Sequence, residues 1–116
     1  MAPGVVRILV AVEPQMYREV LALHFRQERP LAEVVLASSQ ALQAEVERMR
    51  PHLIVANEVP PKLKERGFWV EMPTSDVPVA SIGANGYSST IHDVSLQDLL
   101  AVVDRADEEL AQNVAS

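Results

Sequence analysis

The chain has 116 residues, of which 48% are hydrophobic and 22% charged, and this length and composition predict one globular domain over residues 1–116 with an ordered core from about 5 to 110. Sixteen acidic against ten basic residues give a formal net charge of -6, which disfavours nucleic acids and acidic membranes as partners. The chain has no cysteine and no apolar run long enough for a signal peptide or membrane span, so we expect a cytoplasmic protein without disulfides or thiolate chemistry.

The first half of the chain alternates between strand and helix patterns. Three short runs of mostly apolar residues predict buried parallel strands, and two runs with apolar residues every three or four positions predict helices between them. In chain order these are a strand at 5–12, a helix at 14–29, a strand at 32–37, a helix between Ser38 or Ser39 and Pro51, and a strand at 53–56. This order predicts a parallel sheet with right-handed crossovers.

The second half is less regular. A short helix is predicted at 61–66, whereas 68–72 fits either its continuation or an extended segment. A strand is predicted at 77–82. Asn85-Gly86 is a hairpin signal before a further strand at 90–92, whose parallel or antiparallel direction stays open. The last predicted element is a helix that starts at a Ser95 and Asp98 capping pair and frays after Gln112.

Three stretches carry a family resemblance. They are Arg7-Ile8-Leu9-Val10-Ala11-Val12-Glu13, Arg18-Glu19, and Arg50-Pro51-His52-Leu53-Ile54-Val55-Ala56-Asn57-Glu58-Val59-Pro60. Together they resemble the receiver domain of bacterial two-component response regulators, a chemotaxis-regulator or flavodoxin-like fold. The resemblance implies a three-layer α/β sandwich with a mainly parallel five-stranded sheet in the order 2-1-3-4-5. The short second half predicts that the fourth helix is lost or vestigial.

The same resemblance implies where a phosphorylation site would lie. In that family two acids after the first strand hold Mg²⁺, an aspartate after the third strand is phosphorylated, a Thr or Ser ends the fourth strand, and a lysine follows the fifth. On this chain the positions hold Val12 and Glu13, Asn57, Gly83 and His92. Only Glu13 keeps the family's chemistry.

These replacements have a physical consequence. An amide such as that of Asn57 is a poor nucleophile for phosphoryl transfer, and Val12 offers Mg²⁺ neither oxygen nor charge. We therefore expect a degenerate pseudo-receiver with no catalytic residue and no metal or other cofactor. Glu58 is expected to be a solvated carboxylate, and the three histidines are expected to be ordinary surface or partly buried residues. Phe68 and Trp69 are expected to pack in the core.

The function predicted from the sequence is a phosphorylation-independent signalling or regulatory protein-interaction module that lacks an output domain and is not an enzyme. Loss of the fourth helix predicts uncovered apolar surface near 79–82 and 90–92, and hence a homodimer or a protein partner there. The alternative is a small-molecule or nucleotide-binding protein that uses the crevice at the carboxyl ends of the strands, with Glu13, Asn57 and Asn85 as its residues.

Overall fold

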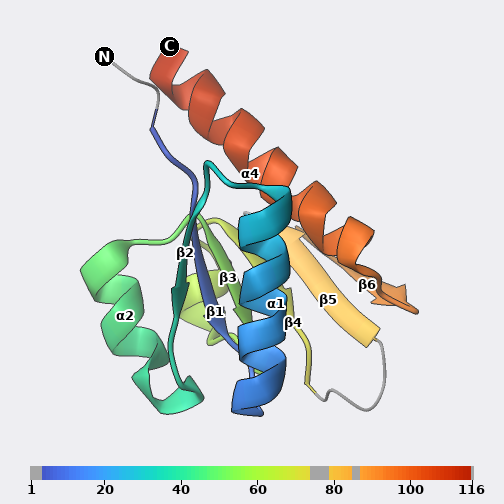
Figure 1. Cartoon of the computed structure of the whole chain (residues 1–116). Coiled ribbons are helices and arrows are strands. Elements are labelled where there is room, and N and C mark those ends of the chain that lie inside the picture. Colours follow the sequence, from blue (N-terminus) through green and yellow to red (C-terminus); the bar gives the residue numbers. More distant parts are fainter. Residues whose placement is uncertain (1–3, 74–78, 85–86, 116) are drawn as a thin grey trace.

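The computed structural model describes residues 4–73, 79–84 and 87–115 and has an α/β architecture (Figure 1). In chain order the elements are β1 (Arg7–Ala11), α1 (Gln15–Glu28), β2 (Glu33–Leu36), a 3₁₀ turn (Ser39–Ala41), α2 (Leu42–Met49), β3 (Leu53–Ala56), α3 (Pro61–Lys64), β4 (Phe68–Glu71), β5 (Val79–Ala84), β6 (Tyr87–His92) and α4 (Leu96–Ala115).

The strands form one mixed sheet in the order β2-β1-β3-β4-β5-β6. The first four strands in that order run parallel, with Ile8 opposite Val34 on one side and Leu53 on the other. β5 and β6 run antiparallel to their neighbours. The predicted β-α-β-α-β first half and its strand order are therefore confirmed.

The prediction of a mainly parallel five-stranded sheet is wrong, because the sheet has six strands and mixed directions. The segment that the sequence left undecided, 68–72, supplies the extra strand β4. Its Phe-Trp-Val run favours a strand, and Gly67 separates it from α3, which has only four residues. β4 lies parallel to β3, in the place where the strand predicted at 77–82 was expected. That later strand is β5, and it runs antiparallel to β4.

The end of the sheet is a hairpin. β6 pairs with β5 from Tyr87 opposite Ala84 to His92 opposite Val79, so the last strand is antiparallel and longer than the predicted 90–92. Only two positions separate the strands, which leaves no room for a helix between them. Val77, Pro78 and the predicted hairpin residues Asn85 and Gly86 lie outside the described residues.

Helices cover both faces of the sheet. α1 and α4 pack on one face and enclose the larger core, whereas α2 packs on the other face over β1 and β3 (Figure 1). The side chains of α2 that point inward are those the spacing predicts: Leu42, Val46 and Met49. Burial of each such side chain contributes about 1.5–3 kcal/mol. Trp69 belongs to the α2 face and Phe68 to the α4 face, so both aromatics are in the core as expected.

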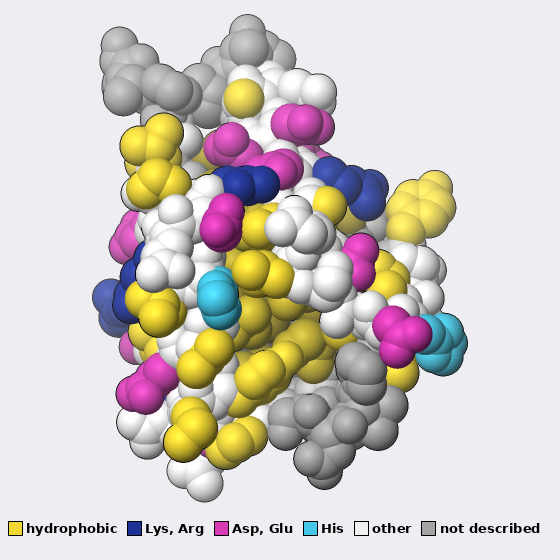
Figure 2. Space-filling view, turned by 45° about the vertical axis from the view of Figure 1, so that its right-hand side comes forward, with side chains coloured by type: hydrophobic (Ala, Val, Ile, Leu, Met, Phe, Trp, Pro, Cys, Tyr) yellow, Lys and Arg dark blue, Asp and Glu magenta, His cyan; other side chains and the backbone are white. Residues whose placement is uncertain are grey.

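α1 buries only part of its apolar surface. Leu21, Ala22 and Phe25 are its buried residues, whereas Met16, Val20 and Leu23 are exposed. The helix has apolar residues around most of its circumference, so periodicity alone did not identify the inner face. Figure 2 shows further hydrophobic side chains gathered in a hollow on the side of the molecule that α1 and α4 share.

α4 begins with the predicted cap. The backbone N–H of Ser95 donates to the carboxylate of Asp98 at 2.8 Å, and the N–H of Asp98 donates to the Ser95 hydroxyl at 3.2 Å. The helix continues to Ala115, past the expected fraying point, since no glycine or proline interrupts it. Among the described residues, no helix is both long and apolar enough to cross a membrane.

Candidate functional site

The carboxyl ends of β1 and β3 bring two of the predicted site residues together. Ala11 and Ala56 lie opposite each other as the last residues of these strands, so the residues that follow them are neighbours. The backbone N–H of Glu13 donates to Oδ1 of Asn57 at 2.7 Å. The Nδ2 group of Asn57 donates to the carbonyl oxygen of Met72, just beyond β4, at 3.0 Å. The Asn57 amide therefore ties together the ends of three parallel strands.

The Glu13 carboxylate is engaged within the fold. Its Oε1 lies 2.7 Å from Nη1 of Arg18, which also donates to the carbonyl oxygen of Ala37 at 3.0 Å. The Arg18 side chain is only 12% exposed, so it is held against the end of β2 rather than extended into solvent. The N–H of Ser39 lies 3.4 Å from the same carboxylate oxygen. The one acid that matches the receiver pattern is thus paired with a cation from the next helix.

Val12 does not contribute to this polar cluster. Its side chain is fully buried in the core under α1 and α4, because it continues the alternation of β1 on that face. Glu58 is exposed at the other side of Asn57, in agreement with its predicted solvation. Glu58 and Asn57 line an open crevice of about 480 Å³ beside the 3₁₀ turn. The rest of its wall is made of polar and apolar residues: Ser39, Gln40, Gln43, Leu42, Ala56 and Pro60.

Gly83 lies far from Asn57. It is opposite Trp69, which in turn is opposite Ile54, so it sits at the level of the start of β3 rather than its end. At strand spacings of about 3.3 Å per residue and 4.8 Å between strands, this is roughly 10 Å along and 10 Å across the sheet from Asn57. The sequence placed Gly83 at the carboxyl edge only because it assumed a parallel strand.

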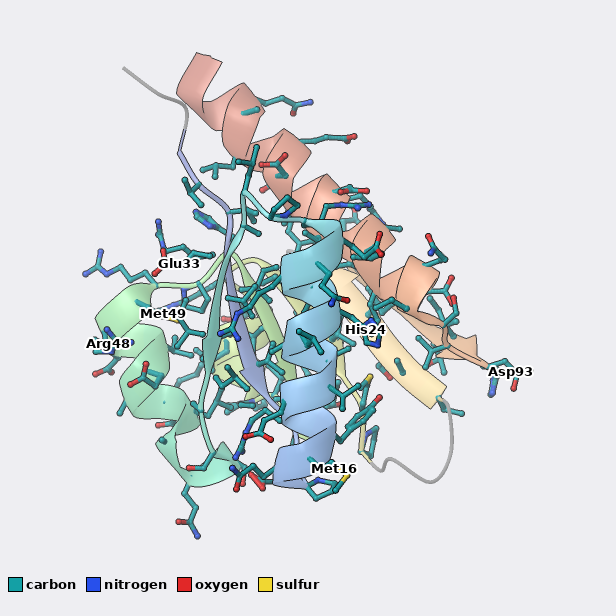
Figure 3. The ribbon with its side chains drawn as sticks, in the orientation of Figure 1. Met16, His24, Glu33, Arg48, Met49 and Asp93 are labelled. Carbon is teal, nitrogen blue, oxygen red and sulfur yellow. The ribbon has the colours of Figure 1, made fainter. Side chains whose placement is uncertain are left out.

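His92 lies at the carboxyl edge of the sheet, as expected, but its strand is further from Asn57 than the predicted strand order implies. It ends β6, three strands from β3, which corresponds to a distance of about 14 Å across the sheet. Asp93, the next residue, lies at the far side of the molecule from α2 in Figure 3. The structure therefore joins Glu13 and Asn57 but adds neither Gly83 nor His92 to them, and Asn85 lies outside the described residues.

Sequence reasoning missed a second polar cluster beside this site. The Glu71 carboxylate, at the end of β4, accepts from the N–H of Val59 at 2.8 Å and lies 3.3 Å from Nζ of Lys64. The same ammonium lies 4.5 Å from the ring centre of Trp69. Once β4 is known to pair with β3, the register that puts Glu71 opposite Ala56 places this carboxylate next to Asn57. The Trp69 Nε1 is buried with no hydrogen-bond partner among the described residues.

The opposite edge of the parallel strands has a titratable group of its own. The Nδ1 atom of His52 accepts a hydrogen bond from the N–H of Arg7 at 2.9 Å, which requires a neutral ring. Burial, and secondly the positive charge of Arg7, lower the pKa of His52. Among the described residues there is no group of three His, Asp or Glu side chains that could hold a metal ion.

This lowered pKa predicts a pH dependence of stability. The unfolded chain binds the His52 proton more readily than the folded one, so stability is full above about pH 6.5 and falls as the pH drops toward the lower folded pKa. Urea unfolding at pH 7.5 and 5.5 measures this loss. We expect a His52→Gln variant to show a smaller loss than the parent protein, and a matched His92→Gln variant to behave like the parent. Equal losses in all three proteins would contradict the prediction.

Comparison with known proteins adds no relative to these observations: no family, no curated protein and no solved structure matches the chain.

Proposed function

We propose that this protein is a receiver-like regulatory module that acts through a protein partner and without being phosphorylated. The observation that carries the proposal is the Asn57 side chain. It occupies the place after β3 where a receiver aspartate would be, and both ends of its amide are used in hydrogen bonds to Glu13 and Met72. A neutral amide held in this way is a structural link and a poor nucleophile.

The surroundings of Asn57 support the same proposal. The Glu13 carboxylate pairs with Arg18, and Val12 points into the core, so the two positions that would hold Mg²⁺ in a receiver domain supply little free negative charge. The parallel β2-β1-β3 order agrees with a receiver-like first half. The β4-β5-β6 half departs from the receiver pattern. We therefore expect this half to contact a partner in a different way from receiver domains.

Exposed apolar side chains support an interaction role. Three exposed residues of α1 follow one another at spacings of four and three: Met16, Val20 and Leu23. Met16 is 75% exposed, and Figure 3 shows it on α1. Apolar side chains grouped on one helix face mark contact surfaces more often than isolated ones do. Ala80 and Ile82 are buried under α4, so the apolar surface expected on β5 is covered on that face.

A second candidate function rests on the crevice of about 480 Å³ beside Asn57 and Glu58. It lies at the carboxyl edge of the parallel strands, which is where α/β proteins commonly bind small molecules. Its wall combines polar side chains with apolar ones such as Leu42 and Pro60, which would suit a small ligand that carries both polar and apolar groups.

A thermal-shift experiment separates the two functions. The protein is heated with Mg²⁺ and beryllofluoride, which mimics an acyl phosphate, and in parallel with a panel of nucleotides and small metabolites. The interaction module is expected to show no change in Tm with any of them. A ligand that fills the crevice would raise Tm in proportion to RT ln(1 + [L]/Kd), and its effect would be reduced in a Gln43→Ala variant of the crevice wall. Such a saturable, variant-sensitive rise would favour the second function.

A further inference from the structure

β6 lies at one edge of the sheet. It spans Tyr87–His92 at the end of the sheet (Figure 1). Five of its six residues are exposed. Among the described residues, its backbone is paired only with β5. Edge strands present a row of free N–H and C=O groups, and proteins usually protect them with lysine, proline, a bulge or a covering element. The sequence Tyr-Ser-Ser-Thr-Ile-His contains neither lysine nor proline, and its pairing with β5 is regular over all six residues.

The other edge of the sheet is protected. β2 has only four residues and begins with the exposed, charged Glu33. The Arg26 guanidinium of α1 donates to the carbonyl oxygen of Val34 at 3.0 Å and so covers part of that edge. The same chain thus blocks pairing at one edge and leaves the longer edge free, which indicates that β6 is kept open for pairing.

We propose that β6 pairs antiparallel with β6 of a second copy of this chain, around a twofold axis at Ser89. This inference deepens the proposed function, since it rests on the interaction role and names the partner. An antiparallel pair of identical strands is compatible with twofold symmetry, and it would join two six-stranded sheets into one. Main-chain hydrogen bonds of the kind used in strand addition would hold the two copies together.

The register is inferred from the side chains that it brings together across the axis. Pairing across the axis must join residues that share a sheet face, and Tyr87 and Ile91 both lie opposite β5 residues that pack toward α4. An axis at Ser89 places each Tyr87 opposite Ile91 of the second copy and each Ser88 opposite Thr90. Aromatic and β-branched pairs stabilise adjacent strands, and hydroxyl side chains can bond across them. This register covers Tyr87, which is 83% exposed in the single chain.

The lack of charge on β6 is compatible with a second copy as its partner. The chain has a net charge of -6, so two copies repel each other over most of their surfaces. β6 contains no acidic and no permanently charged residue, so it is a segment where two copies can approach without placing like charges opposite each other.

Cysteine cross-linking tests the axis directly, because the chain has no cysteine of its own. In a Ser89→Cys variant the two thiols would face each other at a Cα separation of about 4.5–5.5 Å, which a disulfide spans. Under mild oxidation we expect most of this variant to run as a dimer on a non-reducing gel. Thr90→Cys is the control for register and the exposed Ser39→Cys the control for random collision, and both are expected to stay monomeric.

No Ser89→Cys dimer, or equal dimer formation in Ser39→Cys, would overturn the pairing, and preferential cross-linking of Thr90→Cys would overturn the register. Sedimentation equilibrium of the parent chain gives an independent readout. Ser89→Lys, which places two ammonium groups across the axis, is expected to weaken the dimer about tenfold, whereas the matched Gln27→Lys on α1 is not. A monomeric parent chain would overturn the dimer but leave the lack of phosphoryl sensing at Asn57 intact, so the two proposals can fail separately.

Discussion

The Gly83→Ala substitution is expected to lower the free energy of unfolding by about 3 kcal/mol relative to the parent chain. A β-carbon at this position would overlap the Trp69 indole ring and the carbonyl oxygen of Tyr87. The carbonyl belongs to the backbone of β6 and cannot rotate away without breaking the hairpin. The indole cannot move either, because it is buried with α2 on one side and Lys64 above its ring. Urea denaturation followed by circular dichroism measures the loss.

Gly67→Ala is the matched control for this variant. A β-carbon there meets only the His52 carbonyl oxygen at 3.4 Å, and the expected change is less than about 1 kcal/mol. Equal destabilisation of the two variants would contradict the close approach of β5 to Trp69. A large loss of stability in the Gly83→Ala variant alone would mean that packing requires a glycine at this position. A role in a phosphate-sensing site would then not be needed to explain the glycine.

Replacing Asn57 with alanine is expected to lower the free energy of unfolding by a similar amount, about 3 kcal/mol. The variant removes both the acceptor for the Glu13 N–H and the donor for the Met72 carbonyl. Each half-buried backbone group left without a partner costs about 1–3 kcal/mol, less where water can enter. Because the two bonds join the ends of β1, β3 and β4, amide hydrogen exchange near Glu13 and Met72 should accelerate in the variant.

Gln43→Ala provides the comparison, because Gln43 is exposed in the same crevice but has no hydrogen bond to those strand ends among the described residues. Its expected change is within about 0.5 kcal/mol. If Asn57→Ala were no more destabilising than Gln43→Ala, the interpretation of Asn57 as a structural link would be wrong.

The first half of the fold could be predicted because its signals are long and well bounded. The strand at 53–56 is a run of four buried apolar residues between prolines, and α2 shows its inner face through Leu42, Val46 and Met49. The place of Asn57 after β3 and beside Glu13 follows from this pattern and from parallel pairing. Local sequence and tertiary packing agree in this half.

The second half could not be predicted because short segments carry little directional information. Phe68-Trp69-Val70 suits a helix end or a strand, and only the free edge of β3 decides between them. With β4 at that edge, β5 runs in the opposite direction, and Gly83 lies at the level of the start of β3 instead of the expected carboxyl edge. Because the direction of this one strand was predicted wrongly, Gly83 was assigned to a site that lies several strand spacings away from it.

The cluster around Glu71 was missed for a related reason. Its partners Lys64 and Val59 lie 7 and 12 positions away in the chain, and they meet only because α3 is short and β4 pairs with β3. No spacing rule for helices or for single strands joins these residues. The pairing of Arg18 with Glu13 is equally dependent on the turn that follows β1.

We infer that the cluster at the ends of β1 and β3 holds the structure together and does not sense phosphate. Two-dimensional amide NMR of the protein titrated with Mg²⁺ and beryllofluoride tests this claim residue by residue. We expect the signals of Glu13, Asn57 and Met72 to remain where they are in the free protein. Saturable shifts at Glu13 and Asn57, with those of β6 unchanged, would contradict the claim and would mean that the site still binds a metal ion and a phosphoryl group.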